Sequence, residues 1–436
     1  MSLSVTAAPE LWGPALAWRS RSEVRPLERK RDRSAFLVSV WVVIALGAVV
    51  MFEPSPSDIG IALVFVAGFF SRNLRWDQRL TLPYTLLGLF VAANLASLCY
   101  AIDLVQGAFY FAVTLFMLVS WIFVVGVLTN YQERGAQALM AAFTFGGVLS
   151  AFLSTLCYFN LLPFGEWLLF YDREKGFFKD PNVFGPYLVI VAIYALHRVL
   201  LGGTFWRKSV WLTSCLVSSI GVLLCYSRAA WINYAVTLFM FFGFTSISRR
   251  SNRSFWRNLI YFGIFTAIVG TAIVYATTIP QIGDVVSYRA ELQPYDEDRF
   301  TTFNAALQLG IRNPLGVGPL QSYLLLDYAT HNVYLRVFSE NGVLGFLSFA
   351  SFLLLTLTRA VLLSQKALNR TQRSLFALVA AALCGTLLNS LTIDTLHWRH
   401  FWLLLALGWM PLWPGAKSQL KDNRLSLWAE RWARWE

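Results

Sequence analysis

A series of long apolar stretches is the feature that most constrains how this chain can fold. A helix needs about 20 apolar residues to cross a hydrocarbon layer about 30 Å thick. Inside lipid, only helices and closed barrels satisfy every backbone polar group. The sequence therefore predicts an all-α polytopic membrane protein with about twelve transmembrane helices, near residues 35–52, 58–70, 82–101, 104–128, 138–163, 181–200, 209–226, 229–246, 258–280, 341–358, 374–393 and 400–413.

Charge agrees with this class and gives the chain an orientation. Only 14% of the residues are charged, whereas a soluble domain carries roughly a quarter, so a soluble fold is excluded. The net charge of +12 does not indicate nucleic acid, because the Lys and Arg residues concentrate in alternate connections, as cytoplasmic loops require. With both termini in the cytoplasm, the outer segments hold only Arg173, Lys175, Lys179, Arg228, Arg289, Arg299, Arg312, Arg336 and Arg399.

Five segments follow from this topology. The tail places Leu425, Trp428, Trp432 and Trp435 at helical spacing, which is typical of an amphipathic helix on a membrane surface. We expect a basic cytoplasmic arm at 1–34, nine transmembrane helices at 35–280, a large and partly helical outer loop at 281–332, three more helices at 333–413 and the cytoplasmic amphipathic tail at 414–436.

Polar side chains gather on the outer side. Several predicted spans have no charged residue in their middles, and the chain has no phosphate-binding GxxxxGK[ST] run, so a transporter or pump is disfavoured. Polar residues concentrate instead in the loops 164–180 and 281–332 and in the turns Ser227–Arg228 and Asp394–His400. Chemistry is therefore predicted on the face away from the cytoplasm.

The outer arginines are candidates for binding phosphate. Only Ser227 and Arg228 separate two apolar runs, so Arg228 lies at the outer rim of a tight helical hairpin. A guanidinium there runs against the positive-inside bias, and its planar fork suits phosphate oxygens. Arg289, Arg299 and Arg336 lie on the same side. Arg336 can also pair with Glu340, one helical turn later.

Among the four histidines, His331 is the one in the long outer loop beside the membrane. Its reference pKa of about 6.5 makes imidazole a suitable general base. We interpret His197 as interfacial packing, and His397 and His400 as residues of the aromatic belt. The Asp296–Asp298 pair forms a D-x-D pattern, which an acidic helix start explains as well as a metal site does. We predict no metal or other cofactor.

Three stretches together resemble the O-antigen ligase and polymerase superfamily of bacterial envelope membrane proteins. Gly176–Gly185 resembles the family's F-x-[DN]-P-N segment before a span, and Tyr226–Trp231 resembles its S-R-[GA]-A-W turn. Arg299–Gly318, followed by His331–Leu335 and Glu340–Gly345, resembles the core R…NP-x-G-x-G…HN-x-[YF]-L…E-x-G-[LV]-[LI]-G.

The resemblance implies a GT-C-like glycosyltransferase of the bacterial inner membrane whose active site faces the periplasm. Its donor would be O-antigen linked to undecaprenyl diphosphate, and its acceptor a lipid A–core sugar. Polymerases of the superfamily that the chain resembles tend to have two large outer loops. This chain has one, at 281–332, and only a short one at 164–180, so the resemblance implies an O-antigen ligase. An O-antigen polymerase, a protein O-oligosaccharyltransferase and a lipid or glycan transporter stay open as alternatives.

The predicted mechanism needs no metal, because arginine is always charged and can hold the departing diphosphate. Arg228 and Arg289, with Arg299 as the alternative to Arg289, would clamp the diphosphate. His331 would deprotonate the acceptor hydroxyl, and direct displacement would invert the anomeric centre. The further substrate-binding candidates are Arg299, Lys179, Asp180, Asn182, Asn332, Arg336 and Asp394.

Overall fold

The computed structural model describes most of the chain between residues 27 and 413. It leaves out residues 164, 248–255, 257, 258, 262, 265, 268, 269, 272, 273, 276, 277, 292, 293, 327 and 368. For residues 27–33, 280–281, 290 and 294–296 it describes the backbone alone. The predicted amphipathic tail, most of the N-terminal arm and much of the predicted span at 258–280 lie outside the described residues.

Nearly all of the described elements are helices. They are η1 (Gln78–Leu80), α1 (Leu27–Leu46), α2 (Pro56–Phe70), α3 (Thr81–Leu98), α4 (Leu104–Tyr158), α5 (Gly165–Leu168), α6 (Pro181–Leu201), α7 (Phe205–Leu224), α8 (Arg228–Ile247), α10 (Pro280–Ala290), α11 (Pro294–Arg312), α12 (Gln321–Leu325), α13 (Val333–Lys366), α14 (Arg370–Asn389) and α15 (Arg399–Gly408). The exception is a hairpin in which β1 (Leu169–Phe170) pairs antiparallel with β2 (Arg173–Glu174).

Within this part of the chain, six helices are long and apolar enough to cross a membrane: α3 together with η1, α4, α6, α8, α13 and α14. Two shorter apolar helices lie at Ser34–Leu46 and Pro56–Phe70. This agrees with an all-α polytopic membrane protein. The spans predicted at 209–226 and 400–413 correspond to α7 and α15, which are not among the six. The first turn of α7 is polar around Arg207, which makes this helix less apolar. α15 has only 10 residues, which is short for a span.

Two long helices, α4 and α13, are each interrupted by one residue with non-helical backbone angles. α4 has 55 residues, too many for one span, and Gln132 interrupts it with φ 51° and ψ −124°. The predicted spans at 104–128 and 138–163 are therefore joined by a one-residue kink rather than by a loop. α13 is interrupted at Gly342, with φ 68°. A side chain there would meet the Pro314 carbonyl oxygen at 2.3 Å, so glycine allows the 313–318 loop to pack against α13.

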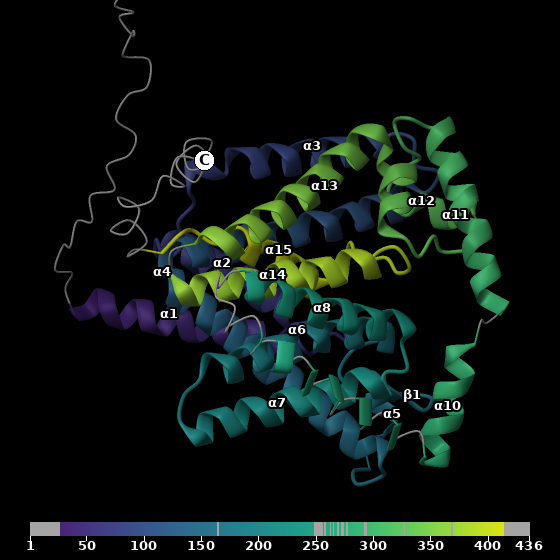
Figure 1. Ribbon diagram of the computed structural model, residues 1–436. Coiled ribbons are helices and arrows are strands. Elements are labelled where there is room, and N and C mark those ends of the chain that lie inside the picture. Colours follow the sequence, from purple (N-terminus) through teal and green to yellow (C-terminus); the bar gives the residue numbers. More distant parts are fainter. Residues whose placement is uncertain are drawn as a thin grey trace, which may run out of the picture.

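The long helices lie side by side, while α10 and α11 cross one end of the bundle (Figure 1). We call this the loop end. In the bundle, α13 packs against α3 and α14, α14 packs against α8, and α6 packs against α7. α1 and α15 both contact α4, and α11 contacts α13. The predicted outer loop 281–332 thus contains α10, α11 and α12 and rests on the bundle through α11.

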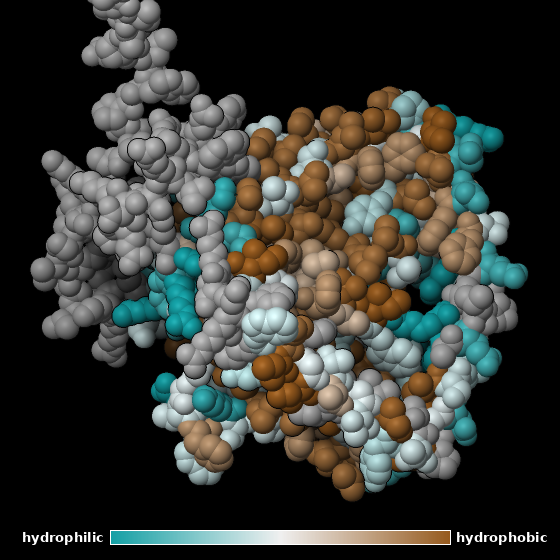
Figure 2. All heavy atoms as spheres, in the orientation of Figure 1, coloured by the Kyte–Doolittle hydropathy of each residue, from teal (hydrophilic) through white to brown (hydrophobic). Residues whose placement is uncertain are grey.

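Hydrophobic residues cover much of the visible side of the bundle, and hydrophilic residues collect at its ends, including the edge formed by α11 (Figure 2). Large apolar side chains that the helices expose include Leu63, Phe70 and Phe239, each more than half exposed. Soluble proteins rarely expose a large contiguous apolar surface, so this band is suited to contact with lipid.

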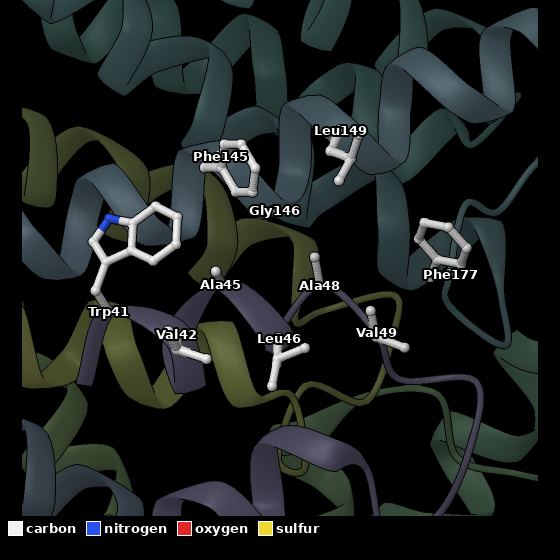
Figure 3. Close-up of a pocket in the computed structure, with 10 residues that line it drawn as sticks. All are labelled: Trp41, Val42, Ala45, Leu46, Ala48, Val49, Phe145, Gly146, Leu149 and Phe177. Carbon is white, nitrogen blue, oxygen red and sulfur yellow. The ribbon is translucent and has the colours of Figure 1, made fainter. Parts of the chain in front are cut away.

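A cavity of about 230 Å³ between α1 and α4 is lined by apolar residues. Trp41, Phe145 and Phe177 lie around it (Figure 3). Gly146 lets the two helices approach closely, because a Cβ there would lie 2.3 Å from the Ala45 carbonyl oxygen. Its described lining has no ionisable group.

Candidate functional site

A second cavity, of about 320 Å³, lies at the loop end and has a very different lining. Four of its residues are arginines, contributed by four separate elements, and the described residues around it include no Asp or Glu. We call it the arginine pocket. It is lined by Arg173, Asn182, Tyr226, Ser227, Arg228, Ala229, Arg289, Arg299, Tyr328 and Ile393.

Arg228 enters the pocket from the predicted helical hairpin. α7 ends at Leu224, and the turn contains Tyr226 with φ 47°, so the chain reverses within a few residues and α8 begins at Arg228. The Ser227 hydroxyl accepts the Ala230 backbone N–H at 3.4 Å and caps the new helix. The Arg228 guanidinium donates to the carbonyl oxygen of Glu291 at 3.2 Å, which ties α8 to the segment after α10.

Arg289 and Arg299 reach the pocket from two successive helices of the outer loop. Arg289 is in the last turn of α10, and Arg299 is in the first half of α11. Both are partly buried and both line the cavity. The sequence did not decide between Arg289 and Arg299. In the structure, both line the same cavity as Arg228.

Arg173 is a pocket residue that the sequence reasoning did not select. It is 8% exposed and lies on β2. Its Nε donates to the Cys225 carbonyl oxygen at 2.9 Å, and its Nη2 donates to Asn182 Oδ1 at 2.9 Å. Its position on the outer side, against the positive-inside bias, was the available signal, and it is the same signal that singled out Arg228.

The segment 179–182 divides into residues inside and outside the pocket. Asn182 lines the cavity and holds Arg173. Asp180 is the N-cap of α6 and accepts the Asn182 backbone N–H at 2.8 Å. Lys179 is about half exposed and pairs with Glu53 at 2.9 Å, so the structure does not bring it to the pocket.

A fully buried carboxyl lies next to Arg173 in the chain. The Ser154 hydroxyl donates to Glu174 Oε2 at 2.8 Å, and Oε1 has no hydrogen-bond partner among the described residues. Burial raises the pKa of Glu174 to about 7. The hairpin is held further by the Phe177 N–H, which donates to the Ser150 hydroxyl at 3.1 Å.

His331 lies at the edge of the pocket, immediately before α13. Its ring contacts that of Tyr328, a pocket residue, with 5.5 Å between the centroids. Burial lowers the pKa of His331 and the positive charge of Arg299 lowers it further, against the opposing effect of Asp394 and Asp180. The imidazole is therefore neutral near neutral pH, as a proton acceptor must be.

Asn332 has a structural role that fixes its neighbour. Its Oδ1 caps α13 by accepting the N–H groups of Tyr334 at 3.0 Å and Leu335 at 3.1 Å. Its amide Nδ2 donates to the Leu391 carbonyl oxygen at 3.0 Å. His331, directly before this cap, has φ 42°, in the left-handed region.

Arg336 and Asp394 lie in a separate ion-pair network. Arg336 Nε contacts Glu340 Oε2 at 3.1 Å, its Nη1 contacts Asp394 Oδ2, and its guanidinium lies over the Tyr110 ring at 4.6 Å. Glu340 also accepts the Ser322 hydroxyl at 2.5 Å. Burial alone would raise the pKa of Asp394, but Arg336 and His397 outweigh it and hold that pKa below its usual value. Neither Arg336 nor Asp394 is among the described residues that line the pocket.

Two of the other histidines, His197 and His400, are packed in the bundle. His197 and His400 are each 4% exposed; His197 Nε2 hydrogen-bonds the Ser374 hydroxyl at 2.9 Å, and the ring of His400 packs edge-on to Tyr187. The interpretation of His400 as a belt residue is therefore wrong, because α15 folds inward. Between residues 27 and 413, as far as the structure describes them, no three His, Cys, Asp or Glu side chains are grouped to hold a metal. The Asp296 side chain lies outside the described residues.

Part of the chain matches a known protein family. Residues 213–350 match the family model described as O-antigen ligase. No curated protein matches the chain. The matched range begins within α7 and ends within α13, so it contains Arg228, Arg289, Arg299 and His331. Arg173 and Asn182, which complete one wall of the pocket, precede it.

Proposed function

Because the chain belongs to the O-antigen ligase and polymerase superfamily, whose members are glycosyltransferase-like membrane enzymes of O-antigen processing, we propose that it is an O-antigen ligase. It transfers O-antigen glycan from undecaprenyl diphosphate to a sugar hydroxyl of lipid A–core. The family match supports this membership, and it includes the Tyr226–Trp231 turn and the core stretch from Arg299 to Gly345. The observation that carries the reaction is the convergence of four arginines on one cavity, next to a histidine whose pKa is lowered.

The arginines suit the donor. A glycosyl diphosphate is already activated, so the remaining requirement is to stabilise negative charge as the diphosphate leaves. Arg228, Arg289 and Arg299 bind the diphosphate as bidentate forks, which requires no change in their protonation. No cofactor is part of the proposal. Activity retained in the presence of a chelator would support it, and loss of activity restored by a divalent ion would overturn the metal-free scheme.

His331 suits the acceptor. In the proposed step the acceptor hydroxyl gives its proton to the neutral imidazole as its oxygen bonds to the anomeric carbon. The bond from that carbon to the diphosphate oxygen breaks, and the diphosphate leaves with the electron pair. Attack from the face opposite the leaving group inverts the anomeric centre. Asn332, as the cap of α13, positions His331 and needs no contact with substrate.

The membrane topology is part of the proposal. The protein lies in the bacterial inner membrane with twelve spans in a GT-C-like arrangement, both termini in the cytoplasm and the arginine pocket facing the periplasm. The bias of Lys and Arg toward the predicted cytoplasmic connections supports this orientation. The hydrophilic edge at α11 supports placing the loop end in water. Accessibility of a cysteine introduced on exposed α11 to a membrane-impermeant reagent would test the orientation.

The choice of ligase over polymerase rests on the outer loops, since 281–332 is the one large loop and 164–180 is short. A lipopolysaccharide gel from a deletion strain, with lipid-linked glycan extracted in parallel, tests it. Bare lipid A–core with long glycan accumulated on the carrier would support a ligase. Core carrying a single repeat would support a polymerase instead. An unchanged ladder would contradict both and favour protein glycosylation or transport.

A further inference from the structure

The helix α11, in the large outer loop, has three chemically different sides. The side that faces α13 is buried and consists of Thr302, Ala306 and Gly310. The contact is close, because a Cβ at Gly310 would meet the Phe338 ring at 2.4 Å. The opposite side is polar and exposed and includes Asn304, Gln308 and Arg312. Only one of these sides is therefore used in packing against the bundle.

The third side of α11 is apolar and lies between the other two. It consists of Phe300, Phe303, Leu307 and Ile311, which we call the α11 stripe. Their spacing puts them on one side of a helix. Phe300 is 64% exposed and Ile311 is 58% exposed, while the Phe303 ring packs edge-on to Phe300 with 6.2 Å between the centroids. α11 thus exposes an apolar side along most of its length.

The loop after α11 determines how deep the stripe lies relative to the membrane. α13 is long and apolar enough to cross a membrane, and between Glu340 and Arg359 it has no charged residue. That stretch is about 27 Å long by the rise of an α-helix, close to the hydrocarbon thickness of about 30 Å. At its loop end, the Val343 N–H donates to the Pro314 carbonyl oxygen at 2.9 Å. The end of α11 is therefore held at the boundary between hydrocarbon and headgroups.

Exposed apolar residues of α13 continue toward the stripe. Leu354, Leu347 and Leu344 lie on one side of the span, and each is more than half exposed. Leu315 is 59% exposed and directly follows Pro314, which bonds to α13. α11 crosses the end of the bundle (Figure 1), so the stripe runs along the membrane surface and not through the membrane. The apolar side of α11 thus extends the side of α13 that is suited to lipid.

We propose that α11 is an interfacial helix whose stripe contacts the acyl chains of the adjacent leaflet, while its polar side faces water. Helices of this kind lie in the membrane plane with their apolar side about 5–10 Å into the boundary of headgroups and acyl chains. Arg299, which lines the arginine pocket, directly precedes Phe300. Lipid contact at the stripe therefore holds this wall of the pocket near the depth of the lipid phosphates. The role depends on α13 crossing the membrane and not on the ligase reaction.

The test is the accessibility of spin labels on the full-length protein in nanodiscs of phosphatidylethanolamine and phosphatidylglycerol. Ile311→Cys and Leu307→Cys place a nitroxide on the stripe, and Gln308→Cys places one on the polar side of the same helix. Each is made in a Cys99→Ser background, because Cys99 is exposed, and the signal of that background alone is subtracted. Oxygen concentrates in hydrocarbon, whereas a nickel chelate stays in water. We expect the ratio of oxygen to nickel collisions to be several-fold higher at the two stripe positions than at Gln308.

The other outcomes overturn the lipid contact. Stripe labels that collide with the nickel chelate as often as the Gln308 label would place the stripe in water. Stripe labels that collide rarely with either reagent would show that protein covers the stripe, as a second copy of the chain could. Thermal unfolding shows whether each variant is folded, and either stripe position serves if the other does not fold. Since no glycan is transferred in this experiment, its failure leaves the ligase proposal in place, and failure of the ligase proposal leaves the lipid contact in place.

Discussion

Arginine occurs in two contrasting settings at the loop end of this protein. Arg336 is 7% exposed and is surrounded by anions and a ring: it contacts Glu340 and Asp394 and lies over Tyr110. The arginine pocket gathers four guanidinium groups around a cavity whose described lining has no carboxylate. The two settings are joined by α13, which begins next to His331 and carries Arg336.

We interpret the difference as one between a structural cation and a proposed ligand-binding cation. In the Arg336 network, each charge has its counter-charge within the protein, so the network joins α13 to the 313–326 segment and to the α14–α15 connection. Such a network has no need of a ligand. In the pocket, the protein concentrates one sign of charge around a space, which raises the local concentration of an anionic ligand. Substitutions in the two settings should therefore separate binding from stability.

The largest expected effect concerns the histidine beside the pocket. His331→Ala should reduce the rate of glycan transfer about 10²- to 10⁴-fold, because the acceptor hydroxyl loses its general base. His397 is the matched control, since it lies beside the Arg336 network and its Nε2 hydrogen-bonds Thr114 at 2.9 Å. His397→Ala should keep most of the activity of its folded fraction. The rates of glycan transfer are measured in a membrane assay. Equal rates for His331→Ala and the wild type would exclude His331 as the general base.

The second largest effect is expected for a substitution of a pocket arginine. Arg228→Ala should lower transfer about 10²- to 10³-fold, as expected when one group that stabilises the leaving charge is removed. The effect should appear in donor affinity and in the maximal rate, with little change in the thermal midpoint. Arg312→Ala, which removes a charge at the end of α11, is the control and should leave transfer unchanged. A loss of stability equal to the loss of activity would make Arg228 a structural residue.

How much the sequence could predict depends on how far apart in the chain the contacting residues lie. Arg228 was predictable because its position follows from a two-residue turn between apolar runs. The outer position of Arg173 was also visible in the sequence, but its orientation was not predictable, since it depends on Cys225, 52 residues away. The pairing of Arg336 with Glu340 follows from helical spacing, but its contact with Asp394 joins residues 58 apart and needs the packed α13, α14 and α15. Turn positions and helical spacing are therefore readable in the sequence. Which arginines line the pocket depends on tertiary packing, which the sequence does not show.

A smaller effect comes from opening the Arg336 network. Glu340→Ala removes the carboxylate that accepts from Arg336, Ser322 and the Leu320 N–H, so it should lower the free energy of unfolding by about 3 kcal/mol. Affinity for inorganic diphosphate should remain within about twofold of the wild type, since the network lies outside the pocket lining. Glu340→Gln keeps the shape and should be less destabilising. A Glu340 variant that is stable but fails to bind diphosphate would show that the two settings are not separate.

Glu174 provides the finest test, because it is a buried acid adjacent in the chain to a pocket arginine. Burial raises the pKa of Glu174 in the folded protein to about 7, above the ordinary value of 4.5, so folding favours its protonated form. The resulting stabilisation is full below about pH 4.5 and is lost as the pH rises through about 7, by on the order of a few kcal/mol. Glu174→Gln, which can still accept from Ser154, should unfold at a midpoint that changes less between about pH 5 and about pH 8. If the variant and the wild type lose stability in parallel over that interval, Glu174 is not the titrating group, and its carboxylate is ionised beside Arg173.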